Sequence, residues 1–150
     1  MIEISYHKQE FWFSCLPACI RMLLEFNAVK IEERQLRKLF KTTIEGGTSW
    51  ANVVSNIKEL DLDFVYLKNQ SLHKLKELTE QGTPAVVSLD TRKLGDFAHR
   101  NHTVVVIHVN KNYVEIHDPE KGPNIQLDIS KFSDAWENRL NRIGYIMKKS

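Results

Sequence analysis

Apolar residues in the N-terminal part of the chain recur at the spacing of amphipathic helices. The first predicted helix follows Ser14, a candidate N-cap, and Pro17 fits its first turn because the amide that proline lacks has no helical partner there. Its apolar stripe consists of Cys15, Cys19, Met22, Leu23 and Phe26. Residues 31–40 predict a second helix. A third helix follows Gly46-Gly47, with the stripe Trp50, Val53, Val54, Ile57 and Leu60.

After Leu60 the pattern changes to short runs rich in β-branched residues, which are typical of strands. Predicted strands cover residues 63–67, 84–89, 102–109, 113–118, 125–129 and 143–147. Two helices are expected at 71–81 and 130–138, and a polar loop at 90–101. Helices first and an antiparallel sheet second predict the α+β class, and the length of 150 residues predicts a single domain, 1–150.

The hairpin of residues 102–118 brings two ionisable residues together. If a three-residue turn is centred on Lys111, His102 lies opposite Glu120, and Asp118 is its diagonal neighbour on the same face. Val104, Val106, Val114 and Ile116 share that face, which is therefore predicted to be the buried one. An imidazole beside a carboxylate at the rim of an apolar face is suited to act as an oriented general base.

Composition excludes several classes of partner. The formal net charge of +2 is too small to indicate a nucleic-acid partner, and we interpret the basic run at 34–41 as a solvated helix face. No segment approaches the ~20 apolar residues of a membrane span, and the N-terminus lacks the apolar core of a signal peptide. The sequence therefore predicts a cytoplasmic protein without a membrane span of its own, in which both cysteines stay reduced.

Cys15 is the candidate nucleophile. A thiol at a helix N-terminus beside a protonated imidazole has a lowered pKa, and His102 can supply that imidazole. Each residue also has a structural interpretation. Cys19 is a small buried hydrophobe, His108 and His117 are polar residues at strand edges, and the His102–Asp118 pair can be purely structural.

Two further alternatives concern a turn and a metal. Asp118-Pro119 can simply open a turn. A zinc site built from Cys15, Cys19 and a histidine is disfavoured, because the cysteines are spaced C-x3-C and no second cysteine pair exists. We expect no metal and no cofactor.

Taken together, the motifs resemble one family. Gln9 and Cys15 stand in "QEFWFSCLPAC", His102 opens "HTVVVIHV", and Asp118-Pro119 with Gly122 form "DPEKG". Weaker similarities are "GGTSWANVVSNIKELDLDFVYL", "GTPAVVSL" and "FSDAW". In this order, over nearly the whole chain, they resemble the papain-like bacteriocin-processing cysteine peptidases. These domains remove double-glycine leader peptides at the N-terminus of peptide-exporting ABC transporters.

The resemblance implies a papain-like cysteine peptidase fold, with an N-terminal helical half packed on a C-terminal antiparallel sheet. It implies Cys15 as nucleophile, His102 as general base and acid, Asp118 as orienting carboxylate and Gln9 as oxyanion donor. Candidate substrate contacts are Trp12, Leu16 and Trp50. The implied partners are a peptide substrate with a double-glycine leader and an ABC transporter, and Met1 with the "MKKS" end fits both a stand-alone relative and an excised transporter domain.

Two positions depart from the family pattern. Ser14 stands where the family usually has Asp, and Leu16 stands where it usually has Gly, which leaves substrate specificity open. Two other functions remain as alternatives. One is a module that binds leader peptides without cutting them, and the other is an acyl transferase or isopeptidase that uses the same triad.

Overall fold

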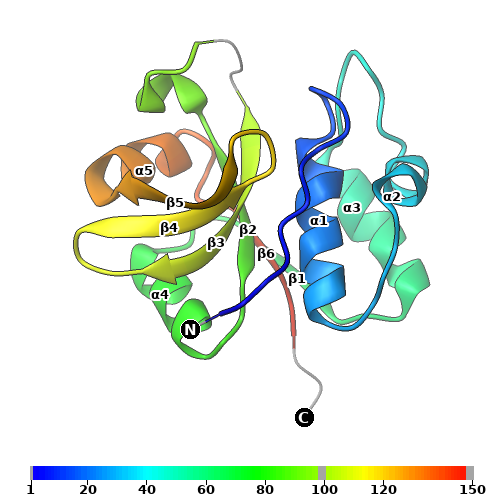
Figure 1. Ribbon diagram of the computed structural model, residues 1–150, viewed down its shortest axis with the longest axis horizontal. Helices are drawn as coiled ribbons and strands as arrows, with labels where there is room; N and C mark the ends of the chain where they lie inside the picture. Colours follow the sequence, from blue (N-terminus) through cyan, green and yellow to red (C-terminus); the bar gives the residue numbers. More distant parts are fainter. Residues whose placement is uncertain (1, 98–100, 148–150) are drawn as a thin grey trace.

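A six-stranded antiparallel sheet with the strand order β1-β6-β2-β3-β4-β5 lies at the centre of the molecule (Figure 1). The computed structural model describes residues 2–97 and 101–147. The strands are β1 (Phe64–Leu67), β2 (Ala85–Leu89), β3 (His102–Val109), β4 (Tyr113–Asp118), β5 (Gly122–Asp128) and β6 (Ile143–Ile146).

Helices cover both faces of this sheet. Helices α1 (Cys15–Phe26), α2 (Glu33–Leu39) and α3 (Trp50–Asn56) form the layer on one face, and α4 (Leu72–Glu80) and α5 (Ile129–Glu137) pack on the other. Two 3₁₀ turns, η1 (Ile57–Leu60) and η2 (Thr91–Leu94), complete the set. The predicted α+β class is confirmed. Across residues 2–97 and 101–147, no helix combines the length and apolarity needed to cross a membrane.

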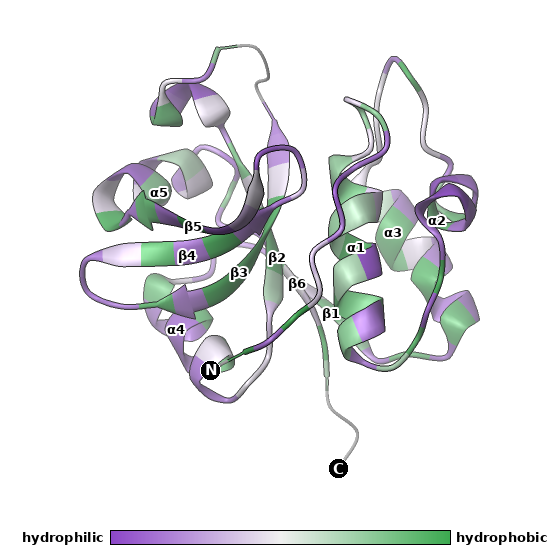
Figure 2. Cartoon of the chain, in the orientation of Figure 1, coloured by the Kyte–Doolittle hydropathy of each residue, from purple (hydrophilic) through white to green (hydrophobic). Residues whose placement is uncertain are grey.

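Strand β3 contributes to two hydrophobic cores, one on each face. Val105 and Ile107 pack with α1, whereas Val104 and Val106 pack with α4 and α5. The prediction of a single buried face was therefore wrong. A strand between two helical layers is apolar at nearly every position, as in "TVVVI", and it does not alternate. In Figure 2, α1 is mainly hydrophobic and α2 mainly hydrophilic, as expected for an inner and an outer helix.

The β3–β4 turn is tighter than the sequence predicts. Val109 pairs with Val114, so the turn has two central residues, not three centred on Lys111. The Asn110 side chain explains the tightness, since its Oδ1 accepts hydrogen bonds from the amides of Asn112 and Tyr113, both at 2.8 Å. A bulge between Val106 and His108 then restores the expected register, and Val105 pairs with His117 as predicted.

Several predicted boundaries shift. Strand β5 begins at Gly122 instead of residue 125, because Asp118 pairs with Gly122 across a short second turn. Ile129 begins α5 instead of ending the strand, since Asp128 Oδ2 accepts from the amides of Ser130 and Lys131 and caps the helix. The predicted loop at 90–101 contains η2, and the predicted third helix divides into α3 and η1.

The segment before α1 is attached to strand β4. His117 Nε2 bonds the carbonyl of Ile4 at 2.9 Å, the Tyr6 hydroxyl donates to the carbonyl of Asp118 at 2.6 Å, and the Gln9 amide donates to the carbonyl of Pro119 at 2.8 Å. His117 was expected at a strand edge, but it is buried in an internal strand. Its role is to anchor the chain that leads to Cys15.

The basic run at 34–41 is not wholly a solvated face. Arg37 is mostly buried and pairs with Glu33 and Glu10, and Phe40 is fully buried. The charge pattern alone could not reveal this, because one of the partners, Glu10, lies before α1.

Gly144 in β6 is a position where the fold leaves no space for a side chain. An added Cβ would lie 2.6 Å from Cζ3 of Trp50 and 2.7 Å from Cζ of Phe64. The Trp50 indole cannot easily shift away, because its N–H donates to Ser88 Oγ at 2.8 Å and its ring stacks on Tyr66. We expect Gly144→Ala to lower the free energy of unfolding by about 1–3 kcal/mol, measured by urea denaturation.

Gly46→Ala is the matched control. A Cβ there would meet only the Thr43 hydroxyl at 3.2 Å, in a backbone conformation that alanine adopts freely. Equal losses for the two variants would contradict the overpacking at Gly144.

Candidate active site

Cys15 is the first residue of α1 and is half-buried. Ser14 occupies the N-cap position, but its side chain does not cap the helix as predicted. Its hydroxyl instead donates to the carbonyl of Phe11 at 2.9 Å and accepts from the Phe11 amide at 3.0 Å. No acidic residue occupies the first turn of α1, so no side-chain charge there opposes a thiolate.

His102, the first residue of β3, contacts both Cys15 and Asp118. Its Nε2 lies 2.7 Å from Oδ1 of Asp118, the last residue of β4. The predicted pairing of these two side chains is confirmed. Because Asp118 occupies Nε2, Nδ1 is the ring nitrogen left for the hydrogen bond with Cys15. The structure therefore aligns Cys15, His102 and Asp118 in that order.

The Asp118 carboxylate also holds the turn that follows it. Oδ1 accepts from the amides of Glu120 at 2.9 Å and Lys121 at 3.2 Å. The alternative that Asp118-Pro119 opens a turn is thus correct as well, and one oxygen serves both purposes. The two backbone amides therefore hold the Asp118 carboxylate in place independently of its contact with the imidazole.

Thr103 is a site residue that the sequence analysis missed. Its hydroxyl donates to Cys15 Sγ at 2.9 Å, and its carbonyl accepts from Cys19 Sγ at 3.4 Å. It is adjacent to His102, but its side chain faces α1. The sequence signal that could have indicated Thr103 is the alternation of side chains along β3, which places neighbouring residues on opposite faces of the sheet.

The surroundings favour the charged form of Cys15. Burial alone would raise the pKa of the thiol, but the hydrogen bond and charge of His102, together with hydrogen bonds from the Thr103 hydroxyl and amide, lower it below its ordinary value. A thiolate is the reactive form of cysteine. Cys15 is therefore prepared to act as a nucleophile.

The surroundings also favour a protonated His102. Burial alone would lower its pKa, but hydrogen bonds and charge attraction to Asp118 and Cys15 raise the pKa to about 10. For Asp118, burial raises the pKa, yet the hydrogen bond and charge of His102 and the amides of Glu120 and Lys121 lower it overall. The three shifts together favour the thiolate of Cys15, the imidazolium of His102 and the carboxylate of Asp118 over their uncharged forms.

Cys19, one turn after Cys15, has the opposite environment. It is fully buried in the core beneath α1, and burial, with the nearby charges of Cys15, Asp118 and Glu33, raises the pKa of its thiol well above the ordinary value. Its assignment as a packing residue is confirmed.

Gln9 is buried in the segment that precedes Cys15. Its Nε2 donates to the carbonyl of Phe11 at 2.8 Å, and its Oε1 has no hydrogen-bond partner among the described residues. An amide nitrogen carries two hydrogens. One N–H of Gln9 therefore remains available to an additional acceptor.

A cleft of about 290 Å³ opens beside Cys15 and His102. It is lined by all three candidate substrate contacts: Trp12 is exposed, whereas Leu16 and Trp50 are buried in its wall. Ser88, which accepts the Trp50 indole hydrogen bond, and the loop 45–48 also line it. The cleft can hold an extended peptide against the thiol.

His108 was expected to be a polar residue at a strand edge, but it lies in the internal strand β3. It is half-buried beside Tyr113, with ring centroids 6.1 Å apart. Within residues 2–97 and 101–147, no group of three or more His, Cys, Asp or Glu side chains is arranged to hold a metal ion. Both cysteines are free thiols.

Comparison with known proteins gives a family and a fold. The model of the peptidase C39 family matches residues 3–141. In structure the chain is similar to a C39-like peptidase from Bacillus anthracis, with a TM-score of 0.81 and 16% identity over 99% of this chain and 96% of that chain. No curated protein matches the chain in sequence.

Two further structures are similar. One is a double glycine motif protease from an AMS/PCAT transporter in complex with the leader peptide, with a TM-score of 0.76 and 17% identity over 97% of this chain and 93% of that chain. The other is the peptidase domain of Streptococcus ComA, a bi-functional ABC transporter, with a TM-score of 0.78 and 18% identity over 99% of this chain and 100% of that chain. These similarities confirm the papain-like fold.

The contrast between the two thiols predicts selective alkylation. At pH 6, iodoacetamide should modify Cys15 much faster than Cys19, because only Cys15 has a lowered pKa and an exposed surface. His102→Ala should slow the reaction and move its pH dependence upward, since it removes the charge that stabilises the thiolate. Peptide mass spectrometry distinguishes the two sites. Equal rates, or faster labelling of Cys19, would refute the assignment.

Proposed function

The chain belongs to the peptidase C39 family, and from this premise we propose that it is a cysteine endopeptidase that cleaves a peptide after small residues such as Gly-Gly. The observation that carries the proposal is the alignment of Cys15, His102 and Asp118, in which the thiol pKa is lowered and the imidazole pKa raised. Such an ion pair supplies a nucleophile and a proton donor at the same pH.

In the proposed reaction, the Cys15 thiolate attacks the scissile carbonyl carbon and forms a tetrahedral intermediate. When this collapses, the carbon–nitrogen bond breaks, and His102 gives its proton to the leaving amine. A thioester acyl-enzyme remains. Water then attacks the thioester while His102 takes its proton. The carbon–sulfur bond breaks, which releases the new carboxyl end and restores the Cys15 thiolate beside the His102 imidazolium. Asp118 keeps the imidazole oriented throughout.

Gln9 and the backbone amide of Cys15 would stabilise the oxyanion. The amide of Cys15 is at the start of α1, where backbone N–H groups have no helical partner. The second N–H of Gln9 is available, because only one is needed for Phe11. A donor that binds the developing oxyanion typically contributes roughly 10²–10³ in rate.

The substrate would be an extended peptide with small residues before the scissile bond. Leu16 and Trp50 fill the wall of the cleft with bulky side chains, which favours glycine over larger residues beside the thiol. The double-glycine leader is supported by the resemblance of the sequence motifs to leader-removing peptidases. The proposal includes an ABC transporter as partner and a cytoplasmic location, where both thiols remain reduced.

The pH dependence of cleavage follows from the two shifted pKa values. The ion pair forms as pH rises through the lowered pKa of Cys15 and is lost as pH rises through the His102 pKa of about 10. kcat/KM should therefore rise with pH through a Cys15 pKa that lies below the ordinary thiol value, and fall only at strongly alkaline pH. Asp118→Asn removes a charge that raises the His102 pKa, so the alkaline limb should move to lower pH. If the alkaline fall of kcat/KM stayed at the same pH in Asp118→Asn, Asp118 would have no role in the reaction.

Variants of Gln9 distinguish catalysis from binding. If Gln9 contacts the oxyanion, Gln9→Ala should lower kcat and kcat/KM by a similar factor of roughly 10²–10³, with KM little changed. Gln9→Glu should be at least as harmful, because it places a negative charge against a negative intermediate. The measurement is cleavage of a peptide carrying a double-glycine leader. A rise in KM alone would mean that Gln9 only contacts substrate.

Cys15→Ala is the reference variant in the same assay. It should abolish turnover and leave peptide affinity nearly intact, because the cleft and not the thiol holds the substrate. A parent protein that binds the peptide without cutting it would support the binding-module alternative and refute the peptidase proposal.

A further inference from the structure

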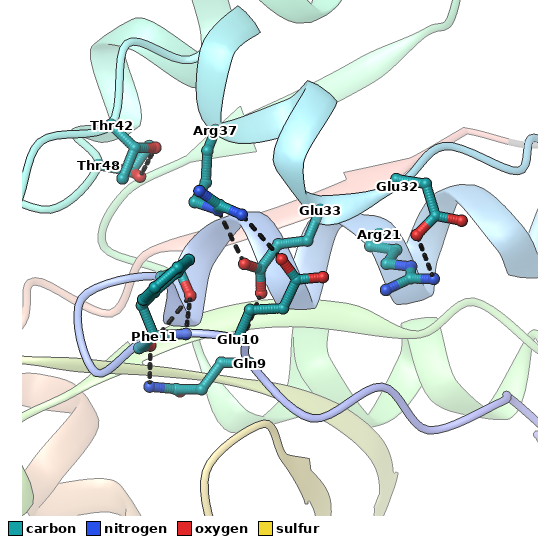
Figure 3. Close-up of polar contacts among 10 residues, drawn as sticks. Gln9, Glu10, Phe11, Arg21, Glu32, Glu33, Arg37, Thr42 and Thr48 are labelled. Atoms are coloured by element: carbon teal, nitrogen blue, oxygen red, sulfur yellow. Dashed lines mark hydrogen bonds and ion pairs between the residues drawn. The ribbon is translucent and has the colours of Figure 1, made fainter.

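Arg37 connects its own helix, α2, to the segment that precedes α1 (Figure 3). Its Nε donates to Glu33 Oε2 at 2.9 Å, and its Nη2 donates to Glu10 Oε1 at 2.7 Å. Its guanidinium also lies over the ring of Phe11, 4.6 Å from the centroid. The second oxygen of Glu33, Oε1, accepts from the backbone amide of Glu10 at 3.0 Å. We call Glu10, Phe11, Glu33 and Arg37 the Arg37 network.

The Arg37 network is not an ordinary surface ion pair. The Glu33 side chain is only 1% exposed, and a carboxylate removed from water needs charged or hydrogen-bonding partners. Arg37 and the Glu10 amide occupy both of its oxygens. The planar guanidinium can bond two carboxylates and stack on a ring at once, which a lysine cannot do. The segment of Glu10 and Phe11 is therefore held to α2 with a defined geometry.

Gln9 depends on that segment for the direction of its side chain. The Nε2 of Gln9 bonds only the carbonyl of Phe11 among the described residues, and its Oε1 has no partner there. Because this is the one hydrogen bond of the Gln9 side-chain amide to the described residues, the position of the Phe11 carbonyl sets the orientation of the amide. The Phe11 carbonyl in turn accepts from the hydroxyl and amide of Ser14, one residue before the nucleophile.

We propose that the Arg37 network is a positioning device for Gln9, an inference that rests on the proposed function. By holding Glu10 and Phe11 against α2, it fixes the carbonyl that orients the Gln9 amide, so that the second N–H meets the oxyanion. Arg37 is thus a positioning residue that acts through Gln9 and touches no substrate. Glu33 keeps Arg37 in place from within the core.

The test is the cleavage kinetics of Arg37→Met on a fluorogenic peptide that spans a Gly-Gly cleavage site. Misplacing a catalytic group by about 1 Å can cost roughly 10²-fold, so we expect kcat to fall by roughly 10- to 10²-fold while KM stays within about twofold. Alkylation of Cys15 by iodoacetamide forms no oxyanion, and its rate should stay unchanged.

A double-variant cycle identifies Gln9 as the route of the effect. If Arg37 acts through Gln9, the Gln9→Ala/Arg37→Met protein should be no slower than Gln9→Ala alone, whereas independent effects would multiply. A further loss of kcat in the double variant, or a change in KM alone for Arg37→Met, would overturn the inference.

Arg21→Met is the matched control. Arg21 and Arg37 are both 19% exposed, and Arg21 also pairs with a glutamate of the α2 region, Glu32, at 3.2 Å (Figure 3). No contact links the Arg21–Glu32 pair to Gln9 or Phe11 among the described residues. Its loss should leave kcat within about twofold of the parent, because Glu32 is 69% exposed and needs no partner to stay solvated. An equal loss of kcat for both arginine variants would overturn the inference.

Because Arg37→Met leaves the Glu33 charge buried, it can lower the stability of the whole chain. Glu10→Ala avoids this problem, since Glu10 is exposed and the Arg37–Glu33 pair remains. It should lower kcat less than Arg37→Met does, and again only when Gln9 is present. An unaltered kcat in both Glu10→Ala and Arg37→Met would reject the network.

A readout without turnover separates failure of this inference from failure of the proposed function. In ¹⁵N-labelled protein, the side-chain amide signals of Gln9 are those that disappear in Gln9→Ala. They should shift in Arg37→Met and stay in place in Arg21→Met. If the parent cuts no peptide, the proposed function fails while this measurement still decides the positioning. Unmoved signals in Arg37→Met would overturn the positioning role.

Discussion

The candidate active site depends on the first two residues of strand β3 pointing to different partners. His102 meets Asp118 at the end of β4, whereas Thr103 faces α1 and contacts the sulfur atoms of Cys15 and Cys19. Neighbouring residues on a strand point to opposite faces, so two adjacent residues of β3 can contact both α1 and the end of β4. Since α1 is packed on β3 by the apolar core, the thiol is brought to the imidazole by folding itself. The distance between the thiol and the imidazole is thus set by the packing of α1 on β3.

The groups that act on Cys15 are themselves held by contacts formed before any substrate binds. Asp118 is fixed through its carboxylate by the Glu120 and Lys121 amides and through its carbonyl by the Tyr6 hydroxyl. Tyr6 lies in the same N-terminal segment that carries Gln9, so this segment joins the hairpin to the start of α1 (Figure 1). Donors and charges that are fixed in advance stabilise a transition state without reorganisation in the reaction. The segment before α1 is therefore as much a part of the site as the triad.

Local patterns allowed much of the fold and the core of the site to be predicted, and contacts distant in sequence account for what was missed. The helical stripe of α1 and the β-branched runs of β2 and β3 gave the correct elements because packing agrees there with propensity. The His102–Asp118 pairing was correct although the turn was wrong, since the bulge after Val106 compensated for it. Thr103 could not be singled out, because its role requires knowing that α1 lies on its face of β3. For Arg37, the partner that the sequence could not reveal was Glu10, which lies 27 residues away, whereas Glu33 is four residues away on the same helix.

The two departures from the family pattern have different structural consequences. Ser14 is fully buried, and its hydroxyl both donates to and accepts from the backbone of Phe11. A carboxylate accepts only, so an aspartate here could not donate to the Phe11 carbonyl, the group that also orients Gln9. Serine therefore suits this turn, because its hydroxyl and the Gln9 side-chain amide both donate to the Phe11 carbonyl. Leu16 packs into the core with one side and lines the cleft with another, so its bulk changes the space beside the thiol without disturbing the triad. Ser14 therefore acts on the geometry around Gln9, and Leu16 acts on the space left for a substrate.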